Sequence, residues 1–339
     1  MKLHIQATRT FLLLVTALCV VGVMSTTAAQ KSAAEEDITV DERRENVLVL
    51  MPDSSTSHDA FKGLSDELGD EFNISSQFVE TTTSVEQLAQ FISDAKPAGL
   101  VLMNNATVSL YRKYQLNTAG PYPAAIMMLT SFLQETSVGI KNATGISYEI
   151  AGITSFVTLR QLLYQPVEKV GVVYRPWAHR FIADQTLLAA TEEIRIIGSQ
   201  ITGEGNIARE VKRAAYQLLT EEKVDAIWIL NDNALLQKQT IANGWLPALK
   251  RSLVPVVVNV ASLVTTKVKF GSFAVLPDHV ELGVQAANII FDLQDQDWLV
   301  TKRFLEDPLA VETILLLEYS QKNFKLKPNA LDRIDKLIR

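Results

Sequence analysis

Short apolar runs alternate along the chain with segments in which apolar residues recur at helical spacing. A short apolar run bounded by turn residues is typical of a buried strand, and a 3.6-residue period is typical of a helix. The predicted strands are 46–52, 74–79, 99–103, 124–130, 145–150, 170–174, 194–201, 224–230, 254–260, 271–276 and 311–319. The predicted helices are 85–95, 108–114, 181–193, 208–219, 234–249, 280–293 and 329–338. Strands that alternate with helices predict parallel sheets built from βαβ units.

The alternation of strands and helices starts again near Lys169. The first strands of the two halves begin at Val47 and Val170. The spacing between these two positions is about the length of one typical domain. We therefore expect an α/β fold with two similarly built lobes. If the two lobes followed one another along the chain, the last third of the chain would belong to neither. We therefore expect the chain to cross between the lobes more than once.

The N-terminus has the pattern of a secretory signal peptide. Lys2 and Arg9 precede the apolar run 11–24, and small residues follow up to Ala29. A charged start, an apolar centre and a small-residue cleavage site predict a signal peptide at 1–29 and cleavage after Ala29. Residues 30–45 are polar and aperiodic, and they are interpreted as a flexible leader. An uncleaved anchor is the alternative, although the run is shorter than the about 20 residues that span a bilayer.

Charge and cysteine content narrow the location and the partners. The formal charge is −6 without a basic block, which argues against nucleic acid and anionic membranes as partners. The single cysteine, Cys19, lies inside the apolar run, and the bulky Leu18 before it argues against lipidation. The mature protein would then contain no cysteine and no thiol chemistry. We expect a periplasmic or secreted protein.

The stretch 224–233, VDAIWILNDN, is the strongest candidate for a ligand-holding segment. A near-continuous apolar run predicts a buried parallel strand, and Asn231, Asp232 and Asn233 follow it. In open α/β sheets, ligands bind at the carboxyl ends of the strands. Asp232 could accept hydrogen bonds from a ligand ammonium group. The alternative is that Asp232 and Asn233 only cap a helix, a position that Asp and Asn favour.

Polar and aromatic residues at other strand ends complete the predicted cleft. Side chains and helix-start N–H groups that could hold a carboxylate lie at Asn105, Thr107, Thr130 and Ser131. Each of these four could equally be an ordinary turn or cap residue. Aromatic walls could come from Tyr148, Tyr174 and Trp177, whereas Trp228 lies in the middle of a strand and is expected in the core. Glu149 could belong to a hinge.

The sequence contains little that points to catalysis. His58, His179 and His279 lie far apart and lack metal-ligand spacing, and no hydrolase, metalloprotease or P-loop motif is present. Gly203 and Gly205 form an isolated Gly-x-Gly that is interpreted as a turn. We expect no enzyme, no cofactor and no bound metal.

Several segments occur in an order that resembles a known family. They are VGVVYRP at 170–176, VDAIWILNDN at 224–233, VPVVVNVASLV at 254–264 and FGSFAVLPDHVELGVQAANII at 270–290. This order is similar to that of the type I periplasmic solute-binding proteins of ABC transporters, and most similar to their tryptophan- and tyrosine-binding branch. The resemblance covers residues 46–325 and rests on the order and spacing of the segments.

The resemblance implies a fold, a site and a mechanism. Two Rossmann-like lobes with parallel sheets would be joined by three hinge crossovers, near 149–151, 277–278 and 312–314. Lobe 1 would comprise 46–150 and 278–312, and lobe 2 would comprise 151–277 and 313–339. Ser262 would join the ligand-binding residues. The protein would be a monomer that closes around a small, amino-acid-like ligand and delivers it to an ABC permease. The alternative is a sensor that reports ligand binding to a signalling partner.

Overall fold

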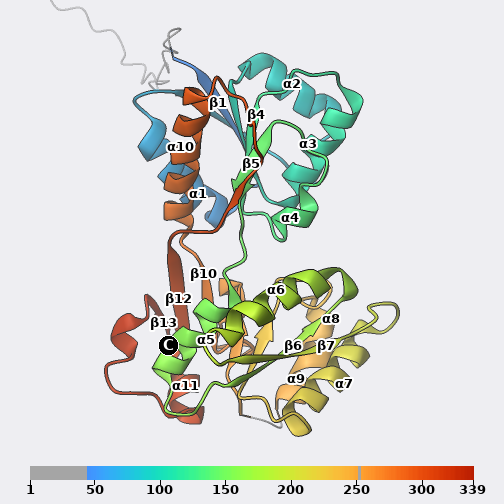
Figure 1. Cartoon of the computed structure of the whole chain (residues 1–339), viewed down its shortest axis with the longest axis vertical. Helices are drawn as coiled ribbons and strands as arrows, with labels where there is room; N and C mark the ends of the chain where they lie inside the picture. The colour runs from blue at the N-terminus through green and yellow to red at the C-terminus, as the bar shows by residue number, and fades with distance from the viewer. Residues whose placement is uncertain (1–43, 251–252) are drawn as a thin grey trace, which may run out of the picture. The chain divides into compact units, whose positions relative to one another are not determined.

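The computed structural model describes residues 44–250 and 253–339 (Figure 1). The predicted signal peptide and most of the predicted leader lie outside the described residues. All described residues belong to one compact unit, Val40–Arg339. Within it the strands form two sheets with helices on both faces of each, which confirms the predicted α/β fold.

The first sheet is parallel throughout, in the order β11-β5-β4-β3-β1-β2. Its strands are β1 (Asn46–Met51), β2 (Asn73–Phe78), β3 (Gly99–Met103), β4 (Ala124–Met128), β5 (Ala143–Ile146) and β11 (Leu305–Glu306). Its helices are α1 (Ser55–Leu68), α2 (Val85–Ala95), α3 (Asn105–Asn117), α4 (Leu133–Thr136) and α10 (His279–Asp295). Because the strands are parallel, the carboxyl ends of β3 and β4 lie at the same edge of the sheet.

The second sheet has the order β13-β12-β10-β9-β8-β6-β7. Its strands are β6 (Lys169–Tyr174), β7 (Arg195–Gln200), β8 (Ala226–Ile229), β9 (Val256–Val258), β10 (Phe273–Pro277), β12 (Val311–Leu316) and β13 (Lys336–Ile338). The pair β10 and β12 is antiparallel, and the other neighbouring strands are parallel. The two antiparallel strands lie directly before and after the segment that leaves the sheet and returns to it.

Alternating side chains divide the first lobe into two core layers. Val47 and Val49 of β1 face α1 and α10, whereas Leu48 and Leu50 face α2 and α3. Helices α1 and α10 run side by side (Figure 1), and they approach closely at Gly63 of α1 and Gly283 of α10. A Cβ at Gly283 would lie 2.0 Å from the carbonyl oxygen of Ala60. The small-residue face of α10 therefore serves close helix packing.

The second lobe has the same layered construction. One face of its sheet is covered by α5 (Gly152–Leu162), α6 (His179–Ala190) and the C-terminal segment, and the other by α7 (Ile207–Thr220) and the 238–249 helical segment. Trp228 is buried between α5 and α6, as predicted, and donates from Nε1 to Asn259 Oδ1 over 3.1 Å. Helix α5, like α1 in the first lobe, was not predicted from the sequence.

Within the described residues, the chain passes between the two sheets at three places. The first is 147–151, between β5 and α5, and the second is Asp278, between β10 and α10. The third is 307–310, between β11 and β12, so the predicted third crossing at 312–314 falls inside β12. The lobe boundaries that the resemblance implies, 46–150 with 278–312 and 151–277 with 313–339, remain a prediction.

The strand predicted at 145–150 is shifted, because β5 ends at Ile146 and the first crossing follows, and three more predicted elements differ in kind or length. The helix predicted at 329–338 is wrong, because Leu331–Arg333 is a short 3-10 turn and β13 pairs with β12, Leu337 opposite Leu315. The strand predicted at 311–319 ends at Leu316, where α11 (Leu317–Asn323) begins. The helix predicted at 234–249 is broken into α8 (Lys238–Thr240), a π-helical turn (Ile241–Trp245) and α9 (Leu246–Leu249).

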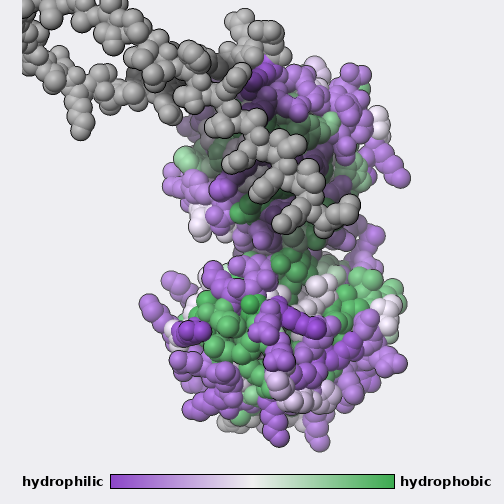
Figure 2. All heavy atoms as spheres, turned by 90° about the vertical axis from the view of Figure 1, so that its left-hand side faces the viewer, coloured by the Kyte–Doolittle hydropathy of each residue, from purple (hydrophilic) through white to green (hydrophobic). Residues whose placement is uncertain are grey.

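On the face shown in Figure 2, hydrophilic side chains dominate, and hydrophobic patches lie between them on the second lobe. None of the helices in the described part of the chain is both long and apolar enough to cross a bilayer.

Candidate functional site

A cleft of about 470 Å³ lies at the carboxyl ends of strands from both sheets. Its lining contains amide and hydroxyl side chains, two aromatic rings and three charged residues: Asn105, Ser131, Phe132, Glu135, Thr136, Arg175, Trp177, Asn231, Asp232 and Asn233. The first five come from segments after β3 and β4, and the other five from segments after β6 and β8. The cleft therefore combines side chains from both lobes at the sheet edges where ligands bind in open α/β folds.

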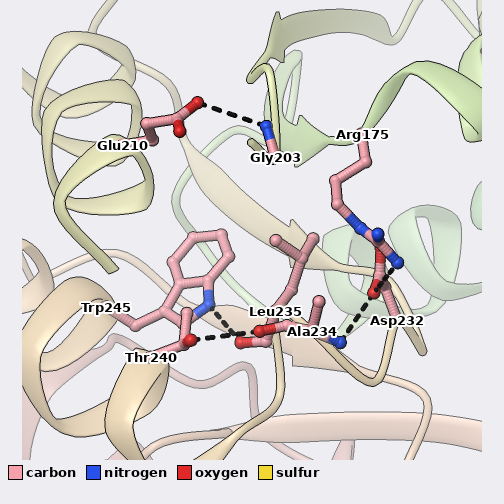
Figure 3. Close-up of polar contacts among 8 residues, drawn as sticks. All are labelled: Arg175, Gly203, Glu210, Asp232, Ala234, Leu235, Thr240 and Trp245. Atoms are coloured by element: carbon pink, nitrogen blue, oxygen red, sulfur yellow. Dashed lines mark hydrogen bonds and ion pairs between the residues drawn. The ribbon is translucent and has the colours of Figure 1, made fainter. Parts of the chain in front are cut away.

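A bidentate ion pair forms part of the second lobe's wall. Arg175 Nε donates to Asp232 Oδ2 over 2.7 Å, and Nη2 donates to Oδ1 over 2.8 Å (Figure 3). The Asp232 side chain is 1% exposed and that of Arg175 is 29% exposed. Asp232 Oδ1 also accepts the backbone N–H of Ala234 at 2.8 Å. A buried carboxylate needs such a set of partners, so Asp232 fixes both Arg175 and the turn after β8.

The first lobe contributes a loop held by reciprocal hydrogen bonds. Asn105 Nδ2 donates to the Ser131 carbonyl over 2.9 Å, and Ser131 N–H donates to Asn105 Oδ1 over 3.0 Å. Asn105 is thereby positioned at the start of α3, which Asn104 caps through its side chain. Across the cleft, Asn231 Nδ2 donates to Ser131 Oγ over 2.7 Å. This bond joins the two lobes directly at the site.

An aromatic cluster forms a second contact between the lobes. Phe132, from the loop after β4, packs edge-on against Trp177 with ring centroids 4.4 Å apart and against Phe181 at 5.4 Å. Phe132 is buried and belongs to the core of the second lobe. Trp177 stays 38% exposed, and the Arg175 guanidinium lies 5.7 Å from its ring centre. The exposed ring is a surface on which an apolar or planar part of a ligand can pack.

Glu149 lies in the first crossing and is connected to the same loop. Its Oε1 accepts the backbone N–H of Phe132 over 2.9 Å. Burial raises the pKa of Glu149 to about 7, and this hydrogen bond, which favours the carboxylate, offsets only part of that effect. The crossing is thus linked through one carboxyl group to the loop that carries Ser131 and Phe132.

Comparisons with known proteins give a match at the level of structure alone. No protein-family model and no curated protein matches the chain. The ligand-free, open form of a substrate-binding protein with adhesive properties from Clostridium difficile is similar at a TM-score of 0.63 and 12% identity, over 87% of this chain and 99% of that chain.

An ABC domain in complex with L-Trp from Streptococcus pneumoniae is similar at a TM-score of 0.58 and 15% identity, over 87% of this chain and 100% of that chain. An arabinose-binding protein from Geobacillus stearothermophilus is similar at 0.53 and 14% identity, over 83% and 99%. The chain has the type I periplasmic binding protein fold. At these identities the likeness establishes the fold of the chain and leaves its ligand open.

Five of the predicted site residues line the cleft of this periplasmic binding protein fold. They are Asn105, Ser131, Trp177, Asp232 and Asn233. Asp232 has a different environment from the predicted one, because its carboxylate is occupied by Arg175 and by the Ala234 N–H. The predicted helix-capping role is wrong, because α8 begins only at Lys238 with Gln237 at its N-cap position, and the Asp232 carboxylate instead holds the turn after β8. The ion pair with Arg175 was not predicted from the sequence.

The other five predicted site residues do not line the cleft. Thr107 and Thr130 are fully buried, and the Thr130 hydroxyl donates to the Met128 carbonyl. Tyr174 packs in the core of the second lobe. Ser262 is exposed on a 3-10 turn, Ala261–Leu263.

Tyr148, the last of these five, lies at the first crossing. Its hydroxyl is 3.1 Å from His279 Nε2, and the two rings are stacked. Burial raises the pKa of Tyr148 to about 12 and lowers that of His279. The pair links the first crossing to the start of α10.

Arg175, Phe132, Glu135 and Thr136 line the cleft without having been predicted from the sequence, whereas Asn231 belongs to the stretch that was put forward as ligand-holding. A signal for Arg175 was present. In the second sheet Val172 of β6 pairs with Trp228 of β8, so Arg175 leaves its strand beside the point where Asp232 leaves the neighbouring one. Two adjacent parallel strands that end in Arg and Asp predict an ion pair, once their adjacency is known. Within the described residues, no cluster of His, Cys, Asp and Glu is arranged to hold a metal ion.

Proposed function

We propose that the protein is an extracytoplasmic solute-binding protein that closes around a small, amino-acid-like ligand and delivers it to an ABC transporter. The proposal rests on one observation above all: a single cleft takes polar, aromatic and charged side chains from both lobes. Polar groups in a ligand site fix the orientation of the ligand, and aromatic rings supply packing surface; here eight of the ten lining residues are polar or charged, which favours a polar ligand.

Closure follows from the way in which the lobes are connected. Three crossings join two well-packed lobes, while the contacts at the cleft are few: the bond from Asn231 to Ser131 and the packing of Phe132. A ligand that touches both walls binds the closed form better than the open form and shifts the equilibrium toward it. A permease would then bind the closed form preferentially.

The experiment is a binding screen with a structural readout. Isothermal titration against amino acids, sugars, organic acids and amines identifies ligands, and small-angle X-ray scattering detects closure as a smaller radius of gyration. Trp177→Ala should weaken binding by about tenfold or more, as expected for an aromatic contact at the centre of a site. Tyr216→Ala, an exposed aromatic on α7 outside the cleft, is the matched control.

The outcomes separate cleanly. A ligand that closes the protein and loses affinity only in Trp177→Ala supports the proposal. If no solute binds, or if a ligand binds equally well to wild type and Trp177→Ala, the assignment of the cleft as the ligand site fails. For the proposed location, N-terminal sequencing of the exported protein should start at Gln30, and sedimentation should show a monomer.

A further inference from the structure

Arg175 presents an unused edge of its guanidinium group to the cleft. Asp232 takes Nε and one hydrogen of Nη2, and no described residue accepts a hydrogen bond from Nη1. Arginine has five N–H donors in a rigid plane, so three of them remain after Asp232 takes two, one on Nη2 and two on Nη1. These donors are already oriented before any ligand arrives.

The stem of Arg175 is held by a glycine loop. Gly203 has a positive φ of +72°, and a Cβ at this position would lie 2.9 Å from Arg175 Cδ and 3.4 Å from Cγ. Only a residue without a side chain leaves room for the arginine stem and adopts this backbone conformation readily. The Gly-x-Gly that the sequence analysis interpreted as a turn therefore lies directly against the ion pair.

Glu210, in the first turn of α7, fixes this loop. Its Oε2 accepts the backbone N–H and the hydroxyl of Thr202, both over 2.8 Å. The same oxygen accepts the N–H of Gly203 over 3.4 Å, as Figure 3 shows. These hydrogen bonds, that of the Thr202 hydroxyl first, lower the pKa of Glu210. The arginine is thus supported at its tip by Asp232, along its stem by Gly203, and on one face by Trp177.

The charges around the cleft set what this arrangement can bind. Asp232 is buried and neutralised by Arg175, so it offers little to a ligand cation. The remaining charged residue of the lining is Glu135, an exposed side chain of α4 in the opposite lobe. An oxyanion next to Arg175 would receive charge-assisted hydrogen bonds from donors that need no reorganisation.

Resting on the proposed function, we infer that Arg175 selects ligands that carry an oxyanion, a carboxylate or a phosphate, and that Gly203 and Glu210 are positioning residues for it. Asp232, the predicted anchor for a ligand ammonium, acts instead by orienting the arginine. The anion would then bind to the second lobe, whereas the sequence predicted a carboxylate site on the first lobe.

The test compares carboxylates with carboxamides that lack the negative charge. Indole-3-acetate against indole-3-acetamide probes the carboxylate alone, L-tryptophan against L-tryptophanamide probes it beside an ammonium group that both keep, and inorganic phosphate and a phosphate monoester form the second arm. Wild type should prefer a carboxylate over its carboxamide partner by about 10- to 100-fold, the range for hydrogen bonds to charged groups. The arm that binds identifies the source of the oxyanion.

The variants distinguish a role of these residues in anion selection from a role in the stability of the fold. Arg175→Gln combined with Asp232→Asn removes both charges without leaving a buried one unpaired, and it should abolish the preference while the protein stays folded by circular dichroism. Gly203→Ala and Glu210→Gln should reduce the preference severalfold without changing affinity for the carboxamide partner. Glu204→Gln, on the same loop with an exposed side chain, is the matched control and should leave the preference unchanged.

A neutral ligand that binds and closes the protein would overturn this inference and leave the proposed function standing. So would an anion preference that survives in the double variant. If no solute of the whole screen binds, the proposed function fails and this inference fails with it.

Discussion

The raised pKa of Glu149 predicts that the stability of the protein depends on pH in an unusual direction. The carboxyl group of Glu149 lies in the first crossing, partly buried, and accepts the Phe132 N–H. Several charged side chains line the same hollow: Glu135, Arg180, Asp184 and Asp307. The substitution Glu149→Gln keeps an oxygen for the Phe132 N–H and removes the titration.

The magnitude follows from the raised pKa. The folded protein keeps the Glu149 proton up to about pH 7, whereas an unfolded chain releases it near the ordinary value of 4.5. Between these two values the unfolded state therefore binds fewer protons, and the free energy of unfolding falls as the pH rises. The difference between the two pKa values corresponds to about 3 kcal/mol in the free energy of unfolding. Because Glu149 is only partly buried, water screens its charge, and we expect about 2 kcal/mol of this effect.

The assay is urea unfolding of wild type and Glu149→Gln at pH values from 4.5 to 8, followed by tryptophan fluorescence and circular dichroism. Coincident transitions of the two signals are needed for a two-state free energy. Relative to wild type, the variant should become more stable by about 2 kcal/mol between pH 4.5 and pH 8. Glu67→Gln, on the exposed side of α1, should show no such trend. A constant difference between wild type and Glu149→Gln across this range would refute the reasoning.

Two further predictions concern packing. Gly283→Ala should lower the free energy of unfolding by about 1–3 kcal/mol, because the new Cβ would overlap the Ala60 carbonyl oxygen. Asn288→Ala, on the exposed face of α10, should lower it little. Equal urea midpoints for the two variants would contradict the close helix contact. Trp228→Phe should cost about 1–3 kcal/mol in the same assay, because the buried Asn259 oxygen loses its donor, and an unchanged free energy of unfolding would show that this bond contributes nothing.

Apolar runs made the strands of the sheets predictable from the sequence, whereas the structure of short amphipathic segments could not be predicted in this way. The buried strands β1, β3 and β6 were found within about a residue of their bounds, because a continuous apolar run has few other uses in a globular chain. The segment 329–338 carries apolar residues at helical spacing, but pairing with the edge of β12 outweighs that local preference. The helix predicted at 234–249 is interrupted by a π-helical turn just before Pro247, which has no N–H to donate.

The candidate site was predictable in position but only partly in its chemistry. Strand ends identified Asn105, Ser131 and Asp232 because polar residues follow apolar runs there. The partner of Asp232 could not be found in the same way, since a sequence does not state which strands are neighbours. Phe132 is a hydrophobic residue within a polar stretch, and its insertion between the aromatic rings of the other lobe depends on tertiary structure alone.

The position of α10 in the chain has a consequence for biosynthesis. The core of the first lobe includes Leu282, Ala286 and Ile290, which are translated after the strands β6 to β10 of the second lobe. Until those residues emerge, we expect the apolar side chains of 46–150 that pack on α10 to lack their partner, which favours aggregation or chaperone binding. Cutting the gene at codon 150 should therefore not give two soluble halves, and the two lobes must mature together late in synthesis.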